Sequence, residues 1–425
     1  MHHGSFEAQL FQSGTGDASW RIAGWLRGPR GLSPRSGKDH AIKAIRLKRG
    51  RGSRGLIKIE TDAGLVGYGP GEGGPETRET IAMLEESPAG GKTGLIGKDP
   101  LAIHVHFQNM FYAIAQRPGD FRAYSGIDMA LWDLAGKILN QPVSKLLGGS
   151  FRSEIDTYSH MVPPRGKTPL ERQSDYLSKD AWRERAQLVE SFQGGFKAFK
   201  IDINHALAVP GGEFTPDLGP REVDTVRRVY ELAREALGPD YDIDVHCHNE
   251  LDLPSAIKVG KAVEGIKPLF FEDPLFPRFS ESWVALRKAT NVPIITGESL
   301  ALIEEALPFI QNQAADCLQI DLSHGGGITG TKIIADVAAA YRIPIALHNV
   351  GGYALNLASQ QFAASVFNCP RIECASSYDK APDAAGNVPV VKEGRMQVTS
   401  LPGLGILPDE DYIKANLADG EPWWG

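Results

Sequence analysis

Nine ionisable residues from position 200 onward are placed as an active site would need them. Each lies at or near the end of a short apolar run, and from Asp244 the runs recur at intervals of 28, 26, 23, 27 and 25 residues. Side chains of these types bind hard cations, transfer protons and stabilise negative charge. One alone could be a helix cap, but the joint pattern indicates a catalytic cluster. The nine are Lys200, Asp202, Asp244, His246, Glu272, Glu298, Asp321, His348 and Glu373.

Three of these carboxylates, Asp244, Glu272 and Glu298, end successive apolar runs and are expected to converge. Three anions in one place repel one another and need a cation. Because the donors are all oxygen and no Cys lies among them, a hard ion is favoured, Mg²⁺ ahead of Mn²⁺ or Ca²⁺. Zinc is disfavoured, because no two histidines and a carboxylate occur at the spacing of a zinc site. We therefore predict one Mg²⁺ per subunit at these residues.

His348 and Asp321 end two further successive runs, so their side chains can be neighbours in a sheet. A carboxylate beside an imidazole fixes the tautomer of the ring and raises its basicity. We therefore interpret His348 as a proton acceptor oriented by Asp321. Four other histidines lie near the ends of runs and could contact substrate, although we interpret them as supporting or solvent-facing groups: His160, His205, His248 and His324.

The elements that must position these residues are eight β-rich runs that alternate with helical stretches such as 220–237 and 328–342. This alternation is typical of a closed parallel α/β barrel, in which catalytic groups lie at the carboxyl ends of the strands. An open doubly wound sheet is the alternative, and chemistry at consecutive strand ends favours the barrel. The runs are 155–160, 196–202, 241–246, 268–273, 292–298, 317–321, 343–348 and 371–375.

The pattern of apolar residues before the barrel predicts a smaller α+β domain. Three runs with alternating apolar and polar residues indicate half-buried strands at 41–47, 55–62 and 65–69, and helical sequence then continues to residue 149. The predicted division is an extension of uncertain order at 1–40, an α+β domain at 41–152, a barrel at 153–385 and a C-terminal segment at 386–425 that returns to the first domain.

The overall composition narrows the class of protein. Among the 425 residues, 42% are hydrophobic and 23% charged, which excludes a disordered or fibrous chain. A net charge of −7 argues against nucleic acid as a partner. No apolar run approaches the roughly 20 residues of a membrane span, and the chain start does not read as a signal peptide. We therefore expect a soluble, cytoplasmic protein that does not contact membranes.

Nine motifs occur along the chain, in this order: TDAGLVGYG, AYSGIDMALWDLAGK, FKAFKID, DVHCH, FFEDP, TGES, QIDLSHGGGITG, ALHNVGG and PGLGILPDED. Together they resemble the mandelate racemase subgroup of the enolase superfamily, in the family's order over residues 41–410. The resemblance implies a modified (β/α)7β barrel beneath an α+β N-terminal capping domain, Mg²⁺ on the three carboxylates and a homo-oligomer. It also implies that the dyad of Asp321 and His348 is the base, while Lys200 and Glu373 assist at the substrate carboxylate.

Two departures from the racemase pattern indicate the reaction type. Racemases of the subgroup carry Lys-x-Lys, but this chain reads Lys200-Ile-Asp202, so the second base is missing or replaced by a weak carboxylate. We assign Asp202 to substrate binding. The sequence Asp244-Val-His246 is similar to galactonate dehydratases, in which this His is the acid for the leaving hydroxyl. The basic loop at 48–54 is short for the family's specificity loop.

We therefore predict a Mg²⁺-dependent dehydratase of a small acid sugar, an aldonate or aldarate. Proton abstraction beside the carboxylate would give an ene-diolate, and loss of the β-hydroxyl would give a 2-keto-3-deoxy acid. One alternative is a racemase, epimerase or cycloisomerase that uses Asp202 on the opposite face. Another is a catalytically idle barrel that binds sugar acids, although a binding module needs no paired base.

Overall fold

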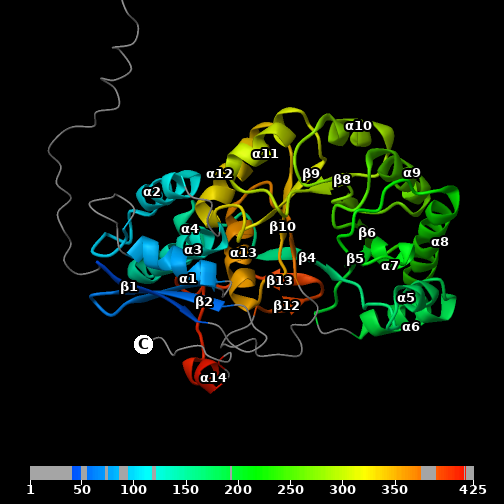
Figure 1. Cartoon of the computed structure of the whole chain (residues 1–425). Helices are drawn as coiled ribbons and strands as arrows, with labels where there is room; N and C mark the ends of the chain where they lie inside the picture. The colour runs from blue at the N-terminus through cyan, green and yellow to red at the C-terminus, as the bar shows by residue number, and fades with distance from the viewer. Residues whose placement is uncertain are drawn as a thin grey trace, which may run out of the picture. The chain divides into compact units, whose positions relative to one another are not determined.

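The computed structural model contains an N-terminal capping domain and a barrel (Figure 1). The predicted extension at 1–40 and residues 49–54 of the basic loop lie outside the described residues. None of the described helices combines the length and the apolar character needed to cross a membrane. The structure describes residues 41–48, 55–71, 75–85, 94–116, 121–191, 194–374, 389–415 and 417.

The capping domain is built on an antiparallel sheet in the order β1-β2-β3, against which α3 packs. Ile57 and Ile59 lie two residues apart on one strand and are fully buried. Glycines in β3 allow a close approach of α3, since a Cβ on Gly69 would lie 2.2 Å from the Gly126 carbonyl oxygen. The elements are β1 (Ile42–Lys48), β2 (Gly55–Thr61), β3 (Val66–Gly71), α1 (Pro75–Glu85), α2 (Ile103–Gln116), α3 (Phe121–Leu139) and α4 (Val143–Leu146).

The barrel consists of eight parallel strands that pair in chain order from β4 to β11. The last strand, β11, pairs in parallel with β10 and also with β4, which closes the ring and excludes the open doubly wound sheet. The fold is therefore a modified (β/α)7β barrel with an α+β capping domain, as predicted. The strands are β4 (Glu154–His160), β5 (Ala198–Asp202), β6 (Asp242–His246), β7 (Phe270–Glu272), β8 (Ile294–Thr296), β9 (Cys317–Asp321), β10 (Ile345–His348) and β11 (Arg371–Glu373).

Helices follow the barrel strands and lie outside them (Figure 1). The predicted helix at 220–237 is α8, which starts at a proline, where the missing N–H costs nothing, and ends before Gly238 with φ of +78°. The helices are α5 (Pro169–Tyr176), α6 (Lys179–Glu190), α7 (Ile203–Leu207), α8 (Pro220–Leu237), α9 (Leu253–Val263), the 3₁₀ turn η3 (Glu264–Ile266), α10 (Glu281–Ala289), α11 (Leu302–Gln311), α12 (Gly327–Ala340) and α13 (Tyr353–Ser365).

Six barrel strands are shorter than predicted, and β8 differs most. Strand β8 has three residues, whereas the apolar run at 292–298 predicted seven. It begins after Pro293, which has no N–H to donate to the sheet, and ends where Gly297 turns the chain with φ of +132°. Glu298 therefore lies on the loop after β8 and not at the strand end itself.

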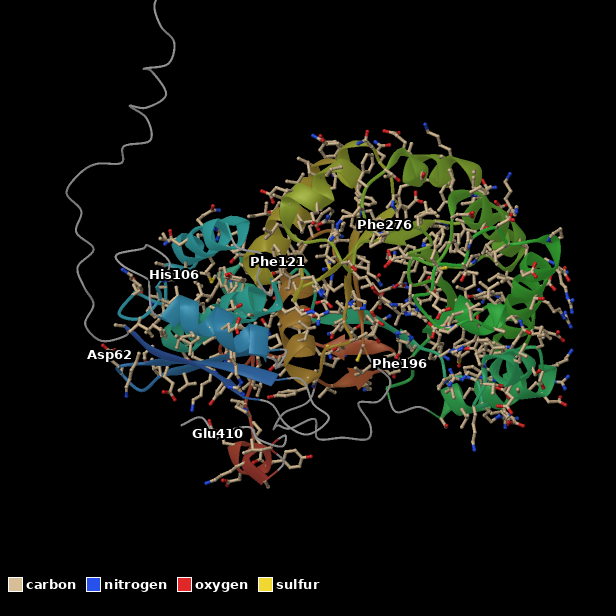
Figure 2. All side chains as sticks on the ribbon, viewed as in Figure 1. Asp62, His106, Phe121, Phe196, Phe276 and Glu410 are labelled. Atoms are coloured by element: carbon tan, nitrogen blue, oxygen red, sulfur yellow. The ribbon has the colours of Figure 1, made fainter. Side chains whose placement is uncertain are left out.

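The C-terminal segment contacts both domains. Its hairpin extends the barrel sheet, because β13 (Arg395–Gln397) pairs with β12 (Val391–Lys392) and also antiparallel with β4. Further along, Asp133 of α3 accepts the Leu404 backbone N–H at 2.7 Å and the Tyr68 backbone N–H at 2.8 Å. Glu410, in α14 (Glu410–Ala415), lies 2.9 Å from the Tyr68 hydroxyl oxygen (Figure 2). Asp133 thus joins β3 to the last part of the chain.

Replacing Gly403 by Ala should destabilise the protein more than replacing Gly64 by Ala. Both glycines have a left-handed backbone, which costs a non-glycine residue about 1–2 kcal/mol. A Cβ at Gly403 would also lie 2.3 Å from Asp133 Oδ1, whereas at Gly64 it would meet nothing within 4 Å. The clash should add about 1–3 kcal/mol, to be read from chemical unfolding of the two variants. Equal losses would mean that the contact with Asp133 relaxes without cost.

Candidate active site

A cavity of about 280 Å³ lies at the carboxyl ends of the barrel strands. It collects side chains from β4, β6, β9 and β10, from the loops that follow strands, and from α3 of the capping domain. Among the described residues that line it, Val350 is the single aliphatic side chain, so the described wall is almost entirely polar. The lining residues are Arg122, His160, His246, His248, Glu298, Ser299, Asp321, His324, His348 and Val350.

His348 and Asp321 form the hydrogen-bonded pair that the sequence predicted. The two residues are directly paired in the register of β9 and β10, and His348 Nδ1 lies 2.7 Å from Asp321 Oδ2. The other carboxylate oxygen of Asp321 accepts from the backbone N–H and the hydroxyl of Ser323, at 2.7 and 2.6 Å. The carboxylate is held on both sides, so it fixes the ring, whose Nε2 lies 3.2 Å from Glu298 Oε2.

The charges around His348 bear on its role as a base. Burial alone would lower its pKa, but Glu373, the hydrogen bond to Asp321 and nearby Glu298 raise the pKa of His348 to about 9. Such a ring holds its proton at neutral pH, whereas a base must be neutral to accept one. A cation placed against these carboxylates would offset the negative charge that raises the pKa. The base role therefore requires added positive charge close by.

Lys200 is fully buried between two carboxylates. Its Nζ lies 2.6 Å from Glu272 and 3.2 Å from Glu373, and it does not line the cavity. Burial opposes the charged form, but Glu272 and Glu373 raise the pKa of Lys200 well above its usual range, so the ammonium remains charged. The predicted contact of Lys200 and Glu373 with a substrate carboxylate stays a prediction.

The residues predicted to hold Mg²⁺ fit a hard divalent cation. Both carboxylate oxygens of Asp244 are buried without a hydrogen-bond partner among the described residues. Burial and neighbouring Glu272 raise the pKa of Asp244 well above its usual range, which indicates a site short of positive charge. One donor atom each from His246, Glu272 and Glu298 also lie within 4.8 Å of one another. Asp244, Glu272 and Glu298 could therefore hold the ion, with the His246 ring as their neighbour.

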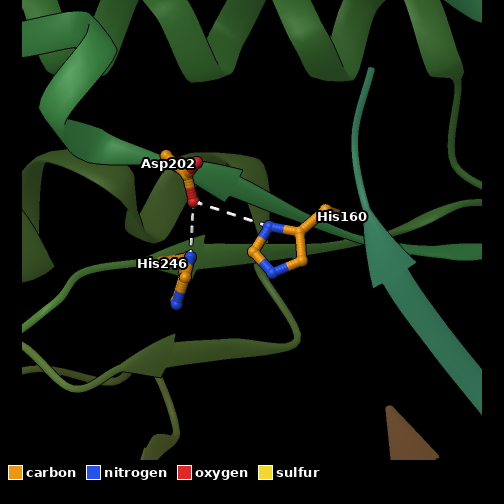
Figure 3. Close-up of side chains that lie close together, drawn as sticks. All are labelled: His160, Asp202 and His246. Atoms are coloured by element: carbon orange, nitrogen blue, oxygen red, sulfur yellow. Dashed lines mark hydrogen bonds and ion pairs between the residues drawn. The ribbon is translucent and has the colours of Figure 1, made fainter. Parts of the chain in front are cut away.

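His246 is held by Asp202, which the sequence assigned to substrate binding. Its Nδ1 lies 2.5 Å from Asp202 Oδ1, and His160 Nδ1 lies 3.8 Å from the same oxygen (Figure 3). Burial would raise the pKa of Asp202, but the hydrogen bond and charge of His246 lower it far below its usual range. Burial and Lys200 lower the pKa of His246.

Several cavity residues were missed or set aside by the sequence analysis. His160, His248 and His324 were treated as supporting or solvent-facing groups, yet all three line the cavity. His160 ends β4, so the strand-end argument applied to later strands would have found it. Arg122, at the start of α3, donates from Nε to His324 Nε2 at 2.8 Å. Arg122 belongs to the other domain, and no spacing rule connects it to a barrel strand.

The fold and the site together point to one class of protein. The barrel is closed and lies under a capping domain, and its mouth holds carboxylates, a buried lysine and paired imidazoles. Two family models match this chain: "Mandelate racemase / muconate lactonizing enzyme, N-terminal domain" over residues 41–148, and "Enolase C-terminal domain-like" over residues 183–412. The chain belongs to the enolase superfamily.

Individual relatives cover most of the chain. D-xylonate dehydratase of Haloferax volcanii is 29% identical over 373 residues, 86% of this chain and 86% of that protein. D-galactonate dehydratase of Variovorax paradoxus is 31% identical over 379 residues, 87% of this chain and 92% of that protein. The solved mandelate racemase/muconate lactonizing enzyme-like protein of Rubrobacter xylanophilus is 25% identical, with a TM-score of 0.78 over 91% of this chain and 100% of that one.

Proposed function

We propose that this protein is a Mg²⁺-dependent dehydratase of an acid sugar, an aldonate or aldarate, that forms a 2-keto-3-deoxy acid. The observation that carries the proposal is the pair of imidazoles, His246 and His348, each bound to a carboxylate through Nδ1 and both lining one polar cavity. Dehydration needs two such groups, because one proton leaves carbon and another is delivered to the departing hydroxyl. The dehydratase names of the two relatives support the same reaction.

Each residue has a defined task in this reaction. His348, held by Asp321, accepts the C2 proton at Nε2. Mg²⁺ bound at the three carboxylates would supply electrostatic stabilisation of the negative charge that develops on the substrate carboxylate. The buried Lys200 ammonium adds positive charge to the same region. His246 donates a proton to the C3 hydroxyl, which leaves as water, and the resulting enol tautomerises to the 2-keto-3-deoxy acid.

The racemase alternative is less well supported. It requires a base on the face opposite His348, and the predicted candidate was Asp202. That carboxylate is already bound to His246, and its lowered pKa makes it a poor proton acceptor. The polar lining of the cavity suits a polyhydroxylated substrate better than an apolar hydroxy acid.

The proposed function predicts that D-xylonate, D-galactonate or another member of an aldonate and aldarate panel yields a 2-keto acid in the presence of Mg²⁺. Trapping with semicarbazide would detect the product. NMR in D₂O would show that the recovered substrate keeps its C2 configuration. The His348→Asn variant, purified in parallel, serves as the control for contaminating activity. Accumulation of a C2 epimer, or no turnover across the panel, would contradict the proposal.

A further inference from the structure

We propose that Asp202 is a positioning residue for His246, so that the site contains two carboxylate–imidazole pairs of the same construction. The inference rests on the proposed function, since it gives the proposed acid a partner. Asp202 and His246 are directly paired in the register of β5 and β6, just as Asp321 and His348 are in β9 and β10. Since β5 and β9 are four strands apart in a closed ring of eight, the two pairs face one another across the mouth.

The contacts around His246 leave one ring atom for the substrate. Nδ1 is engaged by Asp202 at 2.5 Å, while Nε2 points to the other side and lies 3.5 Å from Glu272 Oε1. The ring of His160 packs edge-on against that of His246, with centroids 5.2 Å apart (Figure 3). The centroid of the His248 ring lies 4.3 Å from the centroid of the His246 ring. The hydrogen bond and the two neighbouring rings together fix the orientation of His246.

Asp202 itself is placed to act through His246 and not on the substrate. It is absent from the residues that line the cavity, whereas His246 lines it. Besides His246, the charged or ionisable groups of the described residues that lie within 4 Å of its carboxylate are the imidazoles of His160 and His205, each 3.8 Å away. This reassigns Asp202 from the substrate contact that the sequence suggested.

The step that Asp202 supports is loss of the hydroxyl. In the ene-diolate, the C3–O bond breaks and its electron pair leaves with the oxygen, while a C2=C3 double bond forms. The proton on Nε2 of His246 passes to that oxygen, and water departs. Asp202 accepts the Nδ1–H bond throughout, which keeps Nε2 aimed at the oxygen. Of the two pairs, Asp321–His348 is the one that removes the C2 proton.

The test compares the same substitution in both pairs. The substrate is an acid from the panel that the wild-type protein dehydrates. Deleting a general acid costs a factor of about 10²–10⁴ in rate, and Asp202→Asn should reduce the dehydration rate by a factor that approaches this range. The same variant should still exchange the C2 proton for solvent deuterium. Asp321→Asn should reduce both rates together, because it disturbs the base. The His205→Asn variant, altered beside Asp202 but not in the cavity lining, is the matched control and should keep both rates.

A leaving group that needs no proton separates positioning from general damage. Fluoride departs with the electron pair of the C3–F bond without being protonated, so a 3-deoxy-3-fluoro analogue of the same acid should be processed by Asp202→Asn at close to the wild-type rate. Release of fluoride ion measures this directly. Failure of the analogue to rescue Asp202→Asn, or equal loss of exchange and dehydration, would overturn the proposal.

A spectroscopic readout tests the pair without any turnover. In ¹⁵N-histidine-labelled protein, the His246 signals, assigned with His246→Asn, should show a proton on Nδ1, and Asp202→Asn should shift it to the other tautomer. An unchanged His246 spectrum in Asp202→Asn would overturn the proposal. If instead the wild-type protein dehydrates no acid sugar while this spectrum changes as expected, the pairing holds and the proposed function fails.

Discussion

Removing divalent ions with excess EDTA should abolish dehydration, and added Mg²⁺ should restore it. The physical reason is the charge of the site: Asp244 and Glu272 are buried close together, and the Asp244 oxygens have no hydrogen-bond partner among the described residues. Without a cation, His348 also holds its proton, because nearby carboxylates raise its pKa to about 9. Both charge stabilisation and the base are therefore lost together.

A conservative substitution tests which carboxylates hold the ion. Glu298→Gln should weaken Mg²⁺ binding, measured by calorimetry, because a neutral amide replaces a charged ligand. Glu304→Gln, an exposed change at the start of α11, is the control and should bind Mg²⁺ as the wild type does. Full activity in excess EDTA, with no metal detected by elemental analysis, would rule out the metal site.

Replacing His348 by Asn should remove both dehydration and exchange of the C2 proton, each by about 10²–10⁴-fold. The amide cannot accept the proton that Nε2 of the imidazole would take, so the ene-diolate does not form. NMR in D₂O with a confirmed substrate measures exchange and dehydration in one sample.

The controls for His348→Asn separate loss of chemistry from loss of fold. His104→Asn, an exposed change on α2, should leave both rates intact. Circular dichroism and Mg²⁺ calorimetry should show that His348→Asn folds and retains metal binding. Continued C2 exchange at the wild-type rate in this variant would mean that another group is the base.

The sequence predicted the barrel and its mouth because βα alternation and strand-end chemistry are local signals. It also anticipated the contact of Asp321 with His348, since consecutive strands of a barrel lie side by side. The same argument applies to Asp202 and His246, but at the level of sequence Asp202 was compared only with the second base of racemases. The contact between Asp202 and His246 depends on the register of β5 against β6, which pairs the two residues directly. The connecting helices vary in length, so register cannot be counted along the chain.

Other features depended on long-range packing. The position of Glu298 beyond β8 follows from the turn at Gly297, which an apolar run does not reveal. Arg122 reaches His324 across the junction of two domains, a sequence separation of 202 residues. Local periodicity cannot identify such a partner. The capping domain thus contributes to the cavity in a way that only the assembled fold specifies.

The bonds made by Asp133 have a consequence for the order in which the chain folds during its synthesis. This carboxylate is fully buried and accepts backbone N–H groups from Tyr68 and from Leu404, which are 65 and 271 residues away. The first domain to leave the ribosome therefore lacks one partner for a buried charge until the whole barrel has been translated. The capping domain therefore gains its full set of hydrogen bonds to Asp133 only after the barrel has been translated.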